Sequence, residues 1–456
     1  MITNRNLIVL LAFSFVPLTD ICEAVSTKMP AIYYGNQGWS MKDIQSFSSW
    51  VGKGPIVILL FTDWCNESMN NLFNYQLNNI WNNGSIPAIT WEAFGCGGSS
   101  QPGIMSLVRN HTYDTYITQF GDRLKTWLAG MDGVLGNSDD RRAYLRLAHE
   151  MNGNWYPWSI GSTPQDYIWA WHYIHDLFAN KSLDLTRLQW IWCVNNVDVG
   201  SYTAENYWVG EQYVDWMGID GYNIGTSQSW SSWLNPSQIF DSMIARLQNL
   251  SSTKPICINE YASTSLSTGN ISNITAKYDW LQKFCTYINN KQIIMTSYFN
   301  TDKETDWAIF GGVRGDSFFG NYSAYTAYRD CLQSNDWVII NSTNPRLISD
   351  EEFSGTVLNT TSTTTMVPTT TTSLTSSTAS GTVSSTLVTI GLTTQTTPVT
   401  TANISTNSTI VIMTTTSVIT TTDSTSTAVA IIFQCGIVSQ NRLAMFIFMI
   451  MIFLNN

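Results

Sequence analysis

Short runs of apolar, β-branched and aromatic residues recur eight times between residues 31 and 340, and stretches with helical periodicity separate them. The runs are apolar on both faces, which is typical of parallel strands covered by helices. They span residues 31–36, 56–64, 86–94, 143–153, 188–196, 214–223, 255–262 and 293–301. Eight strand and helix pairs in roughly 310 residues match the size of a (β/α)8 TIM barrel, so the pattern predicts an α/β fold of that class.

Two of the intervening helices have clear start signals. Thr163 and Pro164 form an N-cap followed by proline at the first helical position, and apolar residues then recur at three- or four-residue spacing from Ile168 to Phe178. Asn235 and Pro236 begin a second helix in the same way. We expect both helices to connect consecutive strands of the barrel.

The beginning of the chain has a different pattern. Residues 1–24 run from Arg5 through the apolar stretch LIVLLAFSFV to Cys22 and Ala24, small residues at the positions that a signal peptidase inspects. The stretch is shorter than the roughly 20 residues of a membrane span, so it predicts a cleaved signal peptide. We therefore expect a secreted or extracellular protein with its folded domain in residues 25–345.

The end of the chain differs again. Ser and Thr dominate residues 346–430, with 16 hydroxylic residues among the 21 from Thr360 to Ser380, and such a stretch predicts a disordered, O-glycosylated stalk. Residues 431–456 contain 12 apolar residues from Leu443 to Leu454, which are few for a membrane span. We interpret this tail as a GPI-anchor signal, with a tail-anchored helix as the alternative, and we expect no other contact with a membrane.

Charge and aromatic content narrow the classes of ligand. Only 12% of residues are charged and the formal net charge is −11, so a nucleic-acid partner is disfavoured. Nineteen tryptophans and twenty tyrosines suit neutral ligands that present C–H faces and hydroxyl groups, such as sugars, although most of these rings should lie in the core. Twelve Asn-x-Ser/Thr sequons agree with secretion: Asn66, Asn83, Asn110, Asn180, Asn249, Asn270, Asn273, Asn321, Asn341, Asn359, Asn403 and Asn407.

Polar residues gather at the last positions of the predicted strands, where a barrel places its active site. They include Glu150 and Glu260, at the ends of the fourth and seventh strands, on roughly opposite sides of the barrel mouth. Two carboxyls that face each other suit cleavage of a glycosidic bond, one protonated to assist the leaving oxygen and one ionised to meet the developing positive charge. A lone glutamate would more often be a solvated surface charge.

The segment RLAHEMNGNWYPW around Glu150 resembles the acid/base motif of glycoside hydrolase family 26, whose best-known members are β-mannanases on a (β/α)8 barrel. The likeness extends over about residues 30–335. The resemblance implies that Glu150 is the general acid/base, that His149 binds the sugar in the cleaved subsite and that Trp155 forms an aromatic wall. It also implies that Glu260 is the nucleophile, that Tyr222 is hydrogen-bonded to it and that the reaction retains anomeric configuration.

Alternation along the fourth strand adds Arg146 to the candidate site. Counting back from Glu150, Ala148 and Arg146 point into the barrel, while the leucines between and before them face the helices. A buried cation needs a partner, so we expect Arg146 near the two carboxylates, where it would help to keep Glu260 ionised. A purely structural ion pair is the alternative.

The third strand departs from the family pattern, because it ends in Trp91 and Glu92 where mannanases of the family usually have a histidine that contacts substrate. Both residues are candidates for substrate binding. The departure leaves two substrates open: mannan is preferred, and β-1,3-1,4-glucan is the alternative. Side chains that could stack against sugars are Trp64, Trp91, Trp158, Phe299 and Trp307.

The motif around Glu150 excludes a zinc peptidase, because HExxH would need a histidine where the chain has Gly153. His172 and His175 lie on a predicted helix without an acidic cluster beside them, so surface roles are favoured. The sequence contains no Gly-rich phosphate loop and no nucleophile-elbow serine. We therefore expect no metal and no cofactor.

The cysteines between the two ends of the chain divide into two groups. Two pairs could form disulfides in an oxidising compartment: Cys65 with Cys96, and Cys285 with Cys331. Cys193 and Cys257 lie on strands that are two positions apart in the barrel, about 9–10 Å, beyond the roughly 7 Å that a disulfide can span between Cα atoms. They are therefore expected to be buried free thiols.

Together these features predict a monomeric, secreted or surface-held retaining endo-β-glycanase acting on a neutral polysaccharide or oligosaccharide. Glu260 would attack the anomeric carbon while Glu150 protonates the departing sugar, and Glu150 would then activate water. Burial beside aromatic rings should raise the pKa of Glu150. A non-catalytic carbohydrate-binding surface protein is the alternative from another class, although such a protein would not need both glutamates.

Overall fold

The barrel domain lies within residues 28–356. The computed structural model describes these residues except 292, 335 and 341, leaves out the side chain of residue 270, and describes elsewhere only the backbone of five strands. Eight parallel strands close into a barrel in which β11 pairs with both β2 and β8. All eight predicted strands are confirmed: β2 Met29–Tyr34, β3 Val57–Asp63, β4 Ile86–Glu92, β5 Ala143–Leu147, β6 Leu188–Asn195, β7 Trp216–Asn223, β8 Ile256–Ser263 and β11 Ile293–Asn300.

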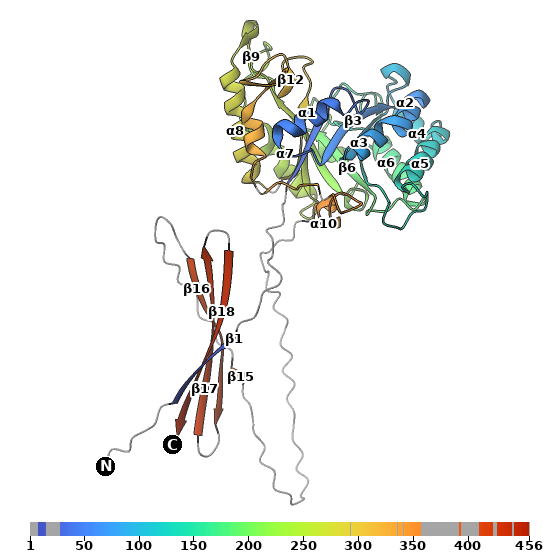
Figure 1. Cartoon of the computed structure of the whole chain (residues 1–456). Coiled ribbons are helices and arrows are strands. Elements are labelled where there is room, and N and C mark those ends of the chain that lie inside the picture. Colours follow the sequence, from blue (N-terminus) through green and yellow to red (C-terminus); the bar gives the residue numbers. More distant parts are fainter. Residues whose placement is uncertain are drawn as a thin grey trace, which may run out of the picture. The chain divides into compact units, whose positions relative to one another are not determined.

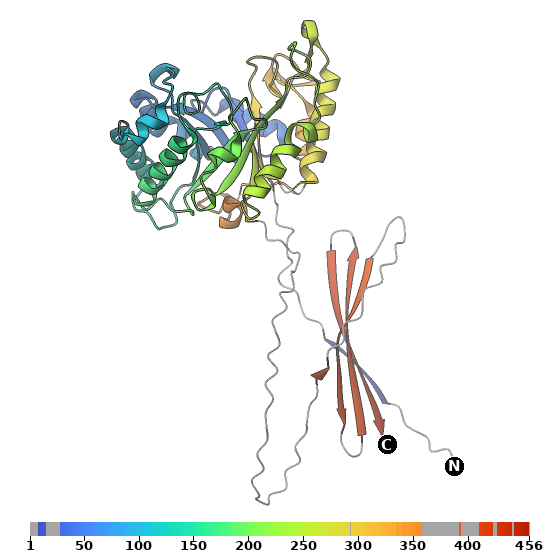
Figure 2. The same cartoon turned by 180° about the vertical axis from the view of Figure 1, so that it is seen from behind.

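Helices surround the barrel as an outer layer (Figures 1 and 2). The predicted starts at Pro164 and Pro236 are confirmed, and each helix begins with a capping box. A π-helical turn, Leu72–Gln76, joins α2 to α3. The α-helices are α1 Lys42–Val51, α2 Asn66–Asn71, α3 Leu77–Asn82, α4 Ile104–Arg109, α5 Asp114–Leu128, α6 Pro164–Ala179, α7 Pro236–Leu250, α8 Ile274–Asn289, α9 Thr326–Cys331 and α10 Asp350–Ser354.

The connection from β6 to β7 departs from the predicted alternation of strands and helices. Residues 196–215, all of which the structure describes, contain two 3₁₀ turns, Ala204–Tyr207 and Glu211–Tyr213, and no α-helix. Gly200 and Gly210 have φ angles of 60° and 92° in this connection. Such left-handed conformations interrupt a right-handed helix, which explains why only short turns form here.

Short strands outside the barrel follow β8 and β11 in the chain. They form one two-stranded sheet and one three-stranded sheet, both antiparallel. Their bounds are β9 Leu266–Ser267, β10 Ile271–Ser272, β12 Phe310–Gly312, β13 Ser317–Phe319 and β14 Tyr322–Ala324. These strands lie in the connections that leave the carboxyl ends of the barrel strands, which is the end where a TIM barrel builds its site.

The predicted cysteine chemistry is confirmed. Disulfides join Cys65 to Cys96 and Cys285 to Cys331. Cys193 and Cys257 are buried and free. The first disulfide ties the residue before α2 to the 3₁₀ turn that follows β4, so it holds two neighbouring loops together at the barrel mouth.

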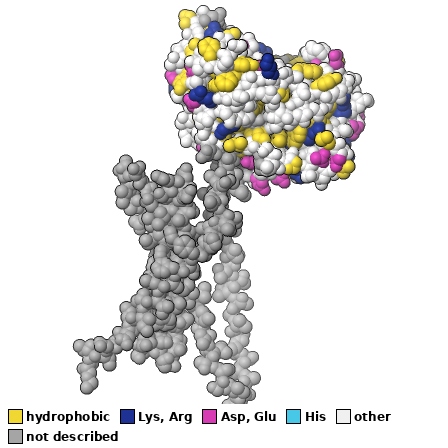
Figure 3. Space-filling view, in the orientation of Figure 1, with side chains coloured by type: hydrophobic (Ala, Val, Ile, Leu, Met, Phe, Trp, Pro, Cys, Tyr) yellow, Lys and Arg dark blue, Asp and Glu magenta, His cyan; other side chains and the backbone are white. Residues whose placement is uncertain are grey.

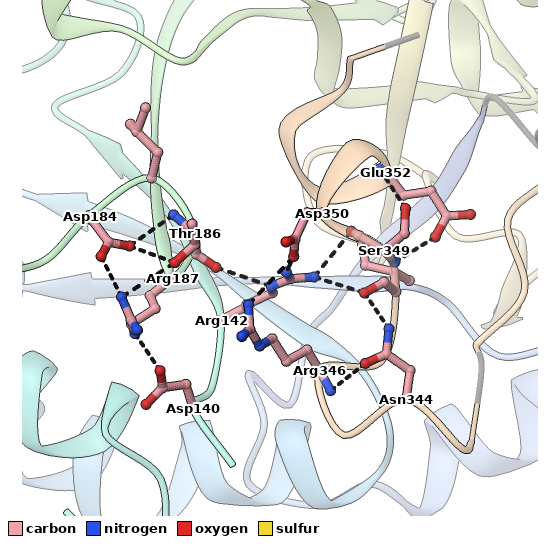
Figure 4. A network of polar contacts seen from close by, with 12 residues as sticks. Asp140, Arg142, Asp184, Thr186, Arg187, Asn344, Arg346, Ser349, Asp350 and Glu352 are labelled. Atoms are coloured by element: carbon pink, nitrogen blue, oxygen red, sulfur yellow. Dashed lines mark hydrogen bonds and ion pairs between the residues drawn. The ribbon is translucent and has the colours of Figure 1, made fainter. Parts of the chain in front are cut away.

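The opposite end of the barrel is closed by α10, which corrects the predicted domain boundary at residue 345. Phe353 of α10 is fully buried, and the Tyr144 hydroxyl donates a hydrogen bond to its carbonyl at 2.9 Å. The guanidinium of Arg142, just before β5, donates to the Ile348 carbonyl at 2.8 Å and pairs with Asp350 (Figure 4). The sequence pattern predicted that residues 346–430 form a Ser/Thr-rich stalk, whereas Phe353, the aromatic residue of α10, is part of the barrel core.

A second unit consists of an antiparallel sheet. Its strand order is β1-β18-β17-β16-β15, with bounds β1 Ile8–Ser14, β15 Leu392–Thr393, β16 Ile410–Thr422, β17 Ser426–Ser439 and β18 Arg442–Asn455. Thr, Val and Ile dominate β16, and β-branched residues suit extended strands. Apart from these strands and residues 346–356, the predicted signal peptide, stalk and tail lie outside the described residues and stay predictions.

Two further properties of the described residues bear on the predicted environment. None of their helices combines the length and apolar character that a bilayer span requires. On the face shown in Figure 3, lysine and arginine side chains are scattered and do not form a continuous basic patch. This distribution agrees with the low charge content of the sequence.

Candidate active site

A pocket of about 570 Å³ lies at the barrel mouth and brings Glu150 and Glu260 together. Aromatic side chains form much of its wall: Tyr33, Phe61, Tyr156, Tyr222, Phe299 and Trp307. Glu92, the last residue of β4, also lines it. Its described lining also includes Glu304, so the pocket combines four carboxyl groups with apolar ring faces.

Glu260 projects from β8 at an irregularity of the sheet. The pairing of β7 with β8 shifts register between Ile219 and Asp220, so Asn259 is an extra residue in β8. Bulges of this kind are common next to active sites because they redirect a side chain. One oxygen of Glu260 accepts a hydrogen bond from Arg146 and the other accepts one from the hydroxyl of Tyr222. Both carboxylate oxygens are therefore held in a fixed orientation.

Arg146 lies where strand alternation predicted it, inside the barrel and beside Glu260. Its side chain is fully buried and makes a second ion pair with Asp220 at 2.7 Å. Its Nε donates to the Thr90 hydroxyl at 2.9 Å. Burial lowers the pKa of Arg146, but Asp220 and Glu260 more than offset this and raise it well above its ordinary value. The guanidinium is thus a permanent cation beneath the pocket.

Glu150 lies on the loop after β5, three residues beyond the last strand residue. Ala148 and Glu150 have φ angles of 44° and 51°, in the left-handed region that non-glycine residues seldom occupy. The backbone N–H of Glu150 donates to the Cys193 carbonyl at 2.9 Å, which helps to hold this conformation. Burial, and next the negative charge of Glu260, raises the pKa of Glu150 to about 7.

Trp155 is connected to Glu150 directly. Its indole Nε1–H donates to Glu150 Oε2 at 2.9 Å, while the ring is 42% exposed. A side chain at Gly153 would collide with the indole ring, which explains the glycine in the motif. Trp155 is thus placed to orient the carboxyl of Glu150, and its predicted role as a wall of the cleft stays a prediction.

His149 lies behind the pocket wall. Its Nε2 is 3.2 Å from the hydroxyl of Tyr156 and 4.0 Å from the Glu260 carboxylate, and the residue is only 1% exposed. Burial and the charge of Arg146 lower the pKa of His149 well below its ordinary value, so the ring is neutral. In this geometry His149 supports Tyr156, which does line the pocket. Its predicted contact with the sugar would require movement of that wall.

The side chains of Trp91 and Glu92 point to opposite sides of β4, and the prediction that Trp91 contacts substrate is wrong. The Trp91 ring is fully buried and stacks on Phe120 of α5, with centroids 4.0 Å apart. Alternation along β4 turns this ring toward the helices and the next side chain, Glu92, toward the pocket. Burial, opposed by the Arg146 cation, raises the pKa of Glu92 to about 8.

The other stacking candidates divide in the same way. Phe299 and Trp307 line the pocket, whereas Trp64 packs against Tyr116 and Trp158 is fully buried. The pocket is also lined by Tyr33, Gln37, Tyr156 and Trp230, which were not predicted from the sequence. Tyr156 could have been found from its place in the motif, and Tyr33 from its place near the end of the first barrel strand. Gln37 and Trp230 lie on loops whose course no local pattern indicates.

One group of described residues has the spacing of metal ligands. His149, Asp220 and Glu260 each offer an atom, and these atoms lie within 4.8 Å of one another. However, Arg146 already pairs with both carboxylates. A metal ion would have to compete with a permanent cation for the same oxygens, so the donor set fits an ion-pair network better than a metal site.

A (β/α)8 barrel with two carboxyl groups in differently tuned surroundings, facing one aromatic-walled pocket, has the site of a glycoside hydrolase. Residues 25–309 match the family described as Glycosyl hydrolase family 26. The chain belongs to this family, as its motif indicated.

Two curated relatives and one solved structure show how far the similarity extends. Endoglucanase H of Acetivibrio thermocellus is 31% identical over 273 residues, which cover 58% of this chain and 27% of that protein. The mannan endo-1,4-beta-mannosidase of Bacillus subtilis is 26% identical over 216 residues, 41% of this chain and 56% of that enzyme. The chain thus spans about a quarter to a half of the length of these relatives.

The solved structure supports the fold. It is the catalytic domain of the GH26 endo-beta-1,4-mannanase of Bacillus sp. JAMB-750, with a TM-score of 0.51 and 15% identity. The match covers 70% of this chain and 88% of that chain. At this low sequence identity the similarity shows a shared barrel fold and says nothing about the substrate.

Proposed function

We propose that the chain is a retaining endo-β-glycanase that hydrolyses a neutral β-1,4-linked polysaccharide, with Glu260 as nucleophile and Glu150 as general acid/base. One observation carries the proposal: the two carboxyls share a pocket but differ in their surroundings. Glu260 is bound by Arg146 and Tyr222, whereas the pKa of Glu150 is raised to about 7. Such a difference suits one ionised and one protonated carboxyl.

In the first step a carboxylate oxygen of Glu260 attacks the anomeric carbon and forms a glycosyl ester. The bond to the leaving oxygen breaks, and the proton of Glu150 passes to that oxygen. Tyr222 and Arg146 restrict the rotation of Glu260, which favours the geometry of attack.

In the second step Glu150, now a carboxylate, accepts a proton from water, and the water oxygen displaces Glu260 from the anomeric carbon. The change in charge assists this step. The negative charge of Glu260 contributes to the raised pKa of Glu150, and this contribution disappears while Glu260 is an ester. The pKa of Glu150 is therefore lower while Glu260 is an ester, so Glu150 is ionised when it must act as a base. It regains its proton as Glu260 is released.

Mannan is the substrate that we propose first. Two relatives are named as mannan endo-1,4-beta-mannosidases. Among the described residues that line the pocket, carboxyl groups outnumber the one cation, Lys303, which suits an uncharged sugar. A β-1,3-1,4-glucan is the second candidate, because Glu92 lines the pocket from the strand on which mannanases of the family usually have a histidine, and because Endoglucanase H is also a relative. That similarity covers 27% of Endoglucanase H, so its name does not assign an activity to the shared segment.

We also propose that the protein acts outside the cell as a monomer held at the surface by its C-terminal tail. Two disulfides support an oxidising compartment. The apolar ends of the sequence and its sequons support export. Mass spectrometry of the mature chain would test both processing events.

The test is an assay of the secreted protein on mannan, β-1,3-1,4-glucan and β-1,3-xylan. We expect hydrolysis of mannan with internal cuts, retention of anomeric configuration by NMR, and no turnover by Glu260→Ala. Turnover of the mixed-linkage glucan alone would select the second candidate. Binding without turnover on all three polymers would support the carbohydrate-binding alternative and overturn the enzymatic proposal.

A further inference from the structure

Two phenylalanines on the hairpin formed by β13 and β14 are exposed to solvent. Phe318 is 78% exposed and Phe319 is 38% exposed, and neither ring lines the catalytic pocket. Phe319 packs in part against the barrel domain, since its ring centroid lies 6.3 Å from that of Phe310. A single exposed ring is common on protein surfaces, so the significance of Phe318 depends on what adjoins it.

The pairing of β13 with β14 determines which side chains share a face of the hairpin. Phe319 is opposite Tyr322, whose ring stacks on Phe310 with centroids 4.7 Å apart, so this pair faces the barrel domain. Phe318 is opposite Ser323, and alternation places this second pair on the other face, toward solvent. The outer face of the hairpin therefore carries an aromatic ring beside a hydroxyl group.

The turn between the two strands contains the asparagine of a glycosylation sequon. Asn321, Tyr322 and Ser323 form the Asn-x-Ser pattern, and Ser323 is the residue opposite Phe318. Gly320 has a φ of 58° and only Gly320 and Asn321 separate the paired residues, which is the pattern of a type II′ hairpin turn. Asn321 is exposed, and its side chain has no hydrogen-bond partner among the described residues. Its amide is therefore free to carry a substituent.

Other sequons of the barrel domain show why this one stands out. The side chain of Asn273 accepts a hydrogen bond from the Ala276 N–H at 3.0 Å and so caps α8. The side chain of Asn83 accepts one from Gln45 at 3.2 Å. Asn249 is exposed but lies within α7, away from any turn. Asn321 combines a free amide, a tight turn and an exposed ring in the adjoining strand.

We propose that Asn321 carries an N-linked glycan whose first sugar unit covers the ring of Phe318. The inference rests on the proposed export of the chain, because such glycans are added along the secretory route. A C–H face of the first sugar would pack against the ring, as apolar sugar faces do on aromatic side chains. Because β13 is an edge strand of its sheet, the glycan would also shield an apolar edge from self-association.

The transfer itself requires an oligosaccharide that is carried on a lipid diphosphate. The Nδ2 atom of Asn321 forms a bond to the anomeric carbon of the oligosaccharide. The bond from that carbon to the diphosphate breaks, and one amide proton leaves with the lipid diphosphate. The modification is therefore neutral for the side chain and adds a bulky, water-soluble group at the turn.

The first test maps glycans on the full chain secreted from a eukaryotic cell. Peptide N-glycosidase converts each glycosylated asparagine to aspartate, so mass spectrometry should find aspartate at position 321. Ser323→Ala should abolish the conversion, and Ser323→Thr, which keeps the sequon, should preserve it. Glycans at other sequons only, or none on a secreted chain, would overturn the site and leave export intact. A chain that stays in the cell without glycans would overturn the proposed export as well, while hydrolysis of mannan tests the proposed activity separately.

The second test asks whether the glycan acts through Phe318, with occupancy checked by mass spectrometry in every variant. Asn321→Gln should lower the melting temperature by about 2 °C when Phe318 is present and leave it unchanged in Phe318→Ala. Hydrogen exchange of residues 317–324 should become faster with the same dependence on Phe318. Asn249→Gln, which removes an exposed sequon on α7, is the matched control and should have the same effect with and without Phe318. Equal effects of Asn321→Gln in both backgrounds, or no effect in either, would overturn the contact between the glycan and the ring.

Discussion

Arg146 on β5 forms an ion pair with Glu260 on β8, 114 residues later in the chain. The same guanidinium pairs with Asp220 on β7, so one cation serves two carboxylates inside the barrel. Removal of one partner from a buried ion pair leaves an uncompensated charge, which costs about 3–5 kcal/mol. The arrangement therefore ties the position of the proposed nucleophile to the stability of the barrel interior.

Arg146→Met is expected to lower kcat/KM at least about 100-fold and to destabilise the fold by about 3–5 kcal/mol, because Asp220 and Glu260 lose their counter-charge. Hydrolysis rates and urea unfolding would measure the two effects. Arg123→Met is the matched control, since Arg123 lies on the outer layer and pairs with amide side chains. Full activity with an unchanged pH profile in Arg146→Met would show that the pair has no part in the reaction.

The pH dependence of kcat/KM should follow the ionisation of Glu150. Its raised pKa of about 7 keeps it protonated below that pH, so activity should fall as the pH rises through about 7 and the acid is lost. Glu150→Gln should remove this alkaline limb. It should also lose far less activity on an aryl glycoside with a good leaving group, whose departure needs little protonation. A limb that survives in Glu150→Gln would assign the titration to another residue.

A substitution at Trp155 should shift the alkaline limb of the pH profile while the acid, Glu150, is retained. Its hydrogen bond to Glu150 Oε2 favours the carboxylate and so lowers the pKa of Glu150. Trp155→Phe keeps a ring but removes the donor, so the pKa of Glu150 should rise and the alkaline limb should shift to higher pH. Trp230→Phe, in the pocket but not bonded to Glu150, should leave the limb in place. A shift of the limb toward lower pH in Trp155→Phe would contradict the inferred hydrogen bond.

Much of this site follows from periodicity and spacing alone. The eight runs gave the barrel, their ends gave Glu150 and Glu260, and alternation gave the inward position of Arg146. Alternation does not reveal an extra residue, so the bulge at Asn259, which allows Glu260 to face the pocket directly after another inward residue, has no signal in the sequence. A strand that is apolar on both faces likewise hides which face is inward, and Trp91 was misplaced for this reason.

A buried lysine is expected to control the loop that carries Trp307. Lys277 on α8 is fully buried, and its ammonium donates to the carbonyls of Asp306, Trp307 and Ala308 at 2.5, 2.9 and 2.8 Å. Lys277→Met keeps the length of the side chain but leaves these carbonyls without their donor, at a cost of about 1–3 kcal/mol for an unsatisfied group. We expect lower unfolding midpoints and a several-fold higher KM, because Trp307 lines the pocket. Lys283→Met, exposed on the same helix, should change neither quantity. An unaltered KM would mean that the loop holds its place without Lys277.

The closing helix at the other end of the barrel should contribute stability without affecting catalysis. Phe353 of α10 is buried beneath the Arg142 guanidinium, whose carbon lies 4.7 Å from the ring centroid, and the polar network around it is shown in Figure 4. Phe353→Ala should cost about 3–5 kcal/mol of unfolding free energy, because it leaves a cavity where an aromatic side chain was packed. Glu351→Ala, exposed on the same helix, is the matched control. Activity under conditions where both variants are folded should equal that of the wild type, because α10 contacts the amino ends of the strands and the pocket lies at their carboxyl ends. Equal urea midpoints for Phe353→Ala and Glu351→Ala would show that the barrel domain does not need α10.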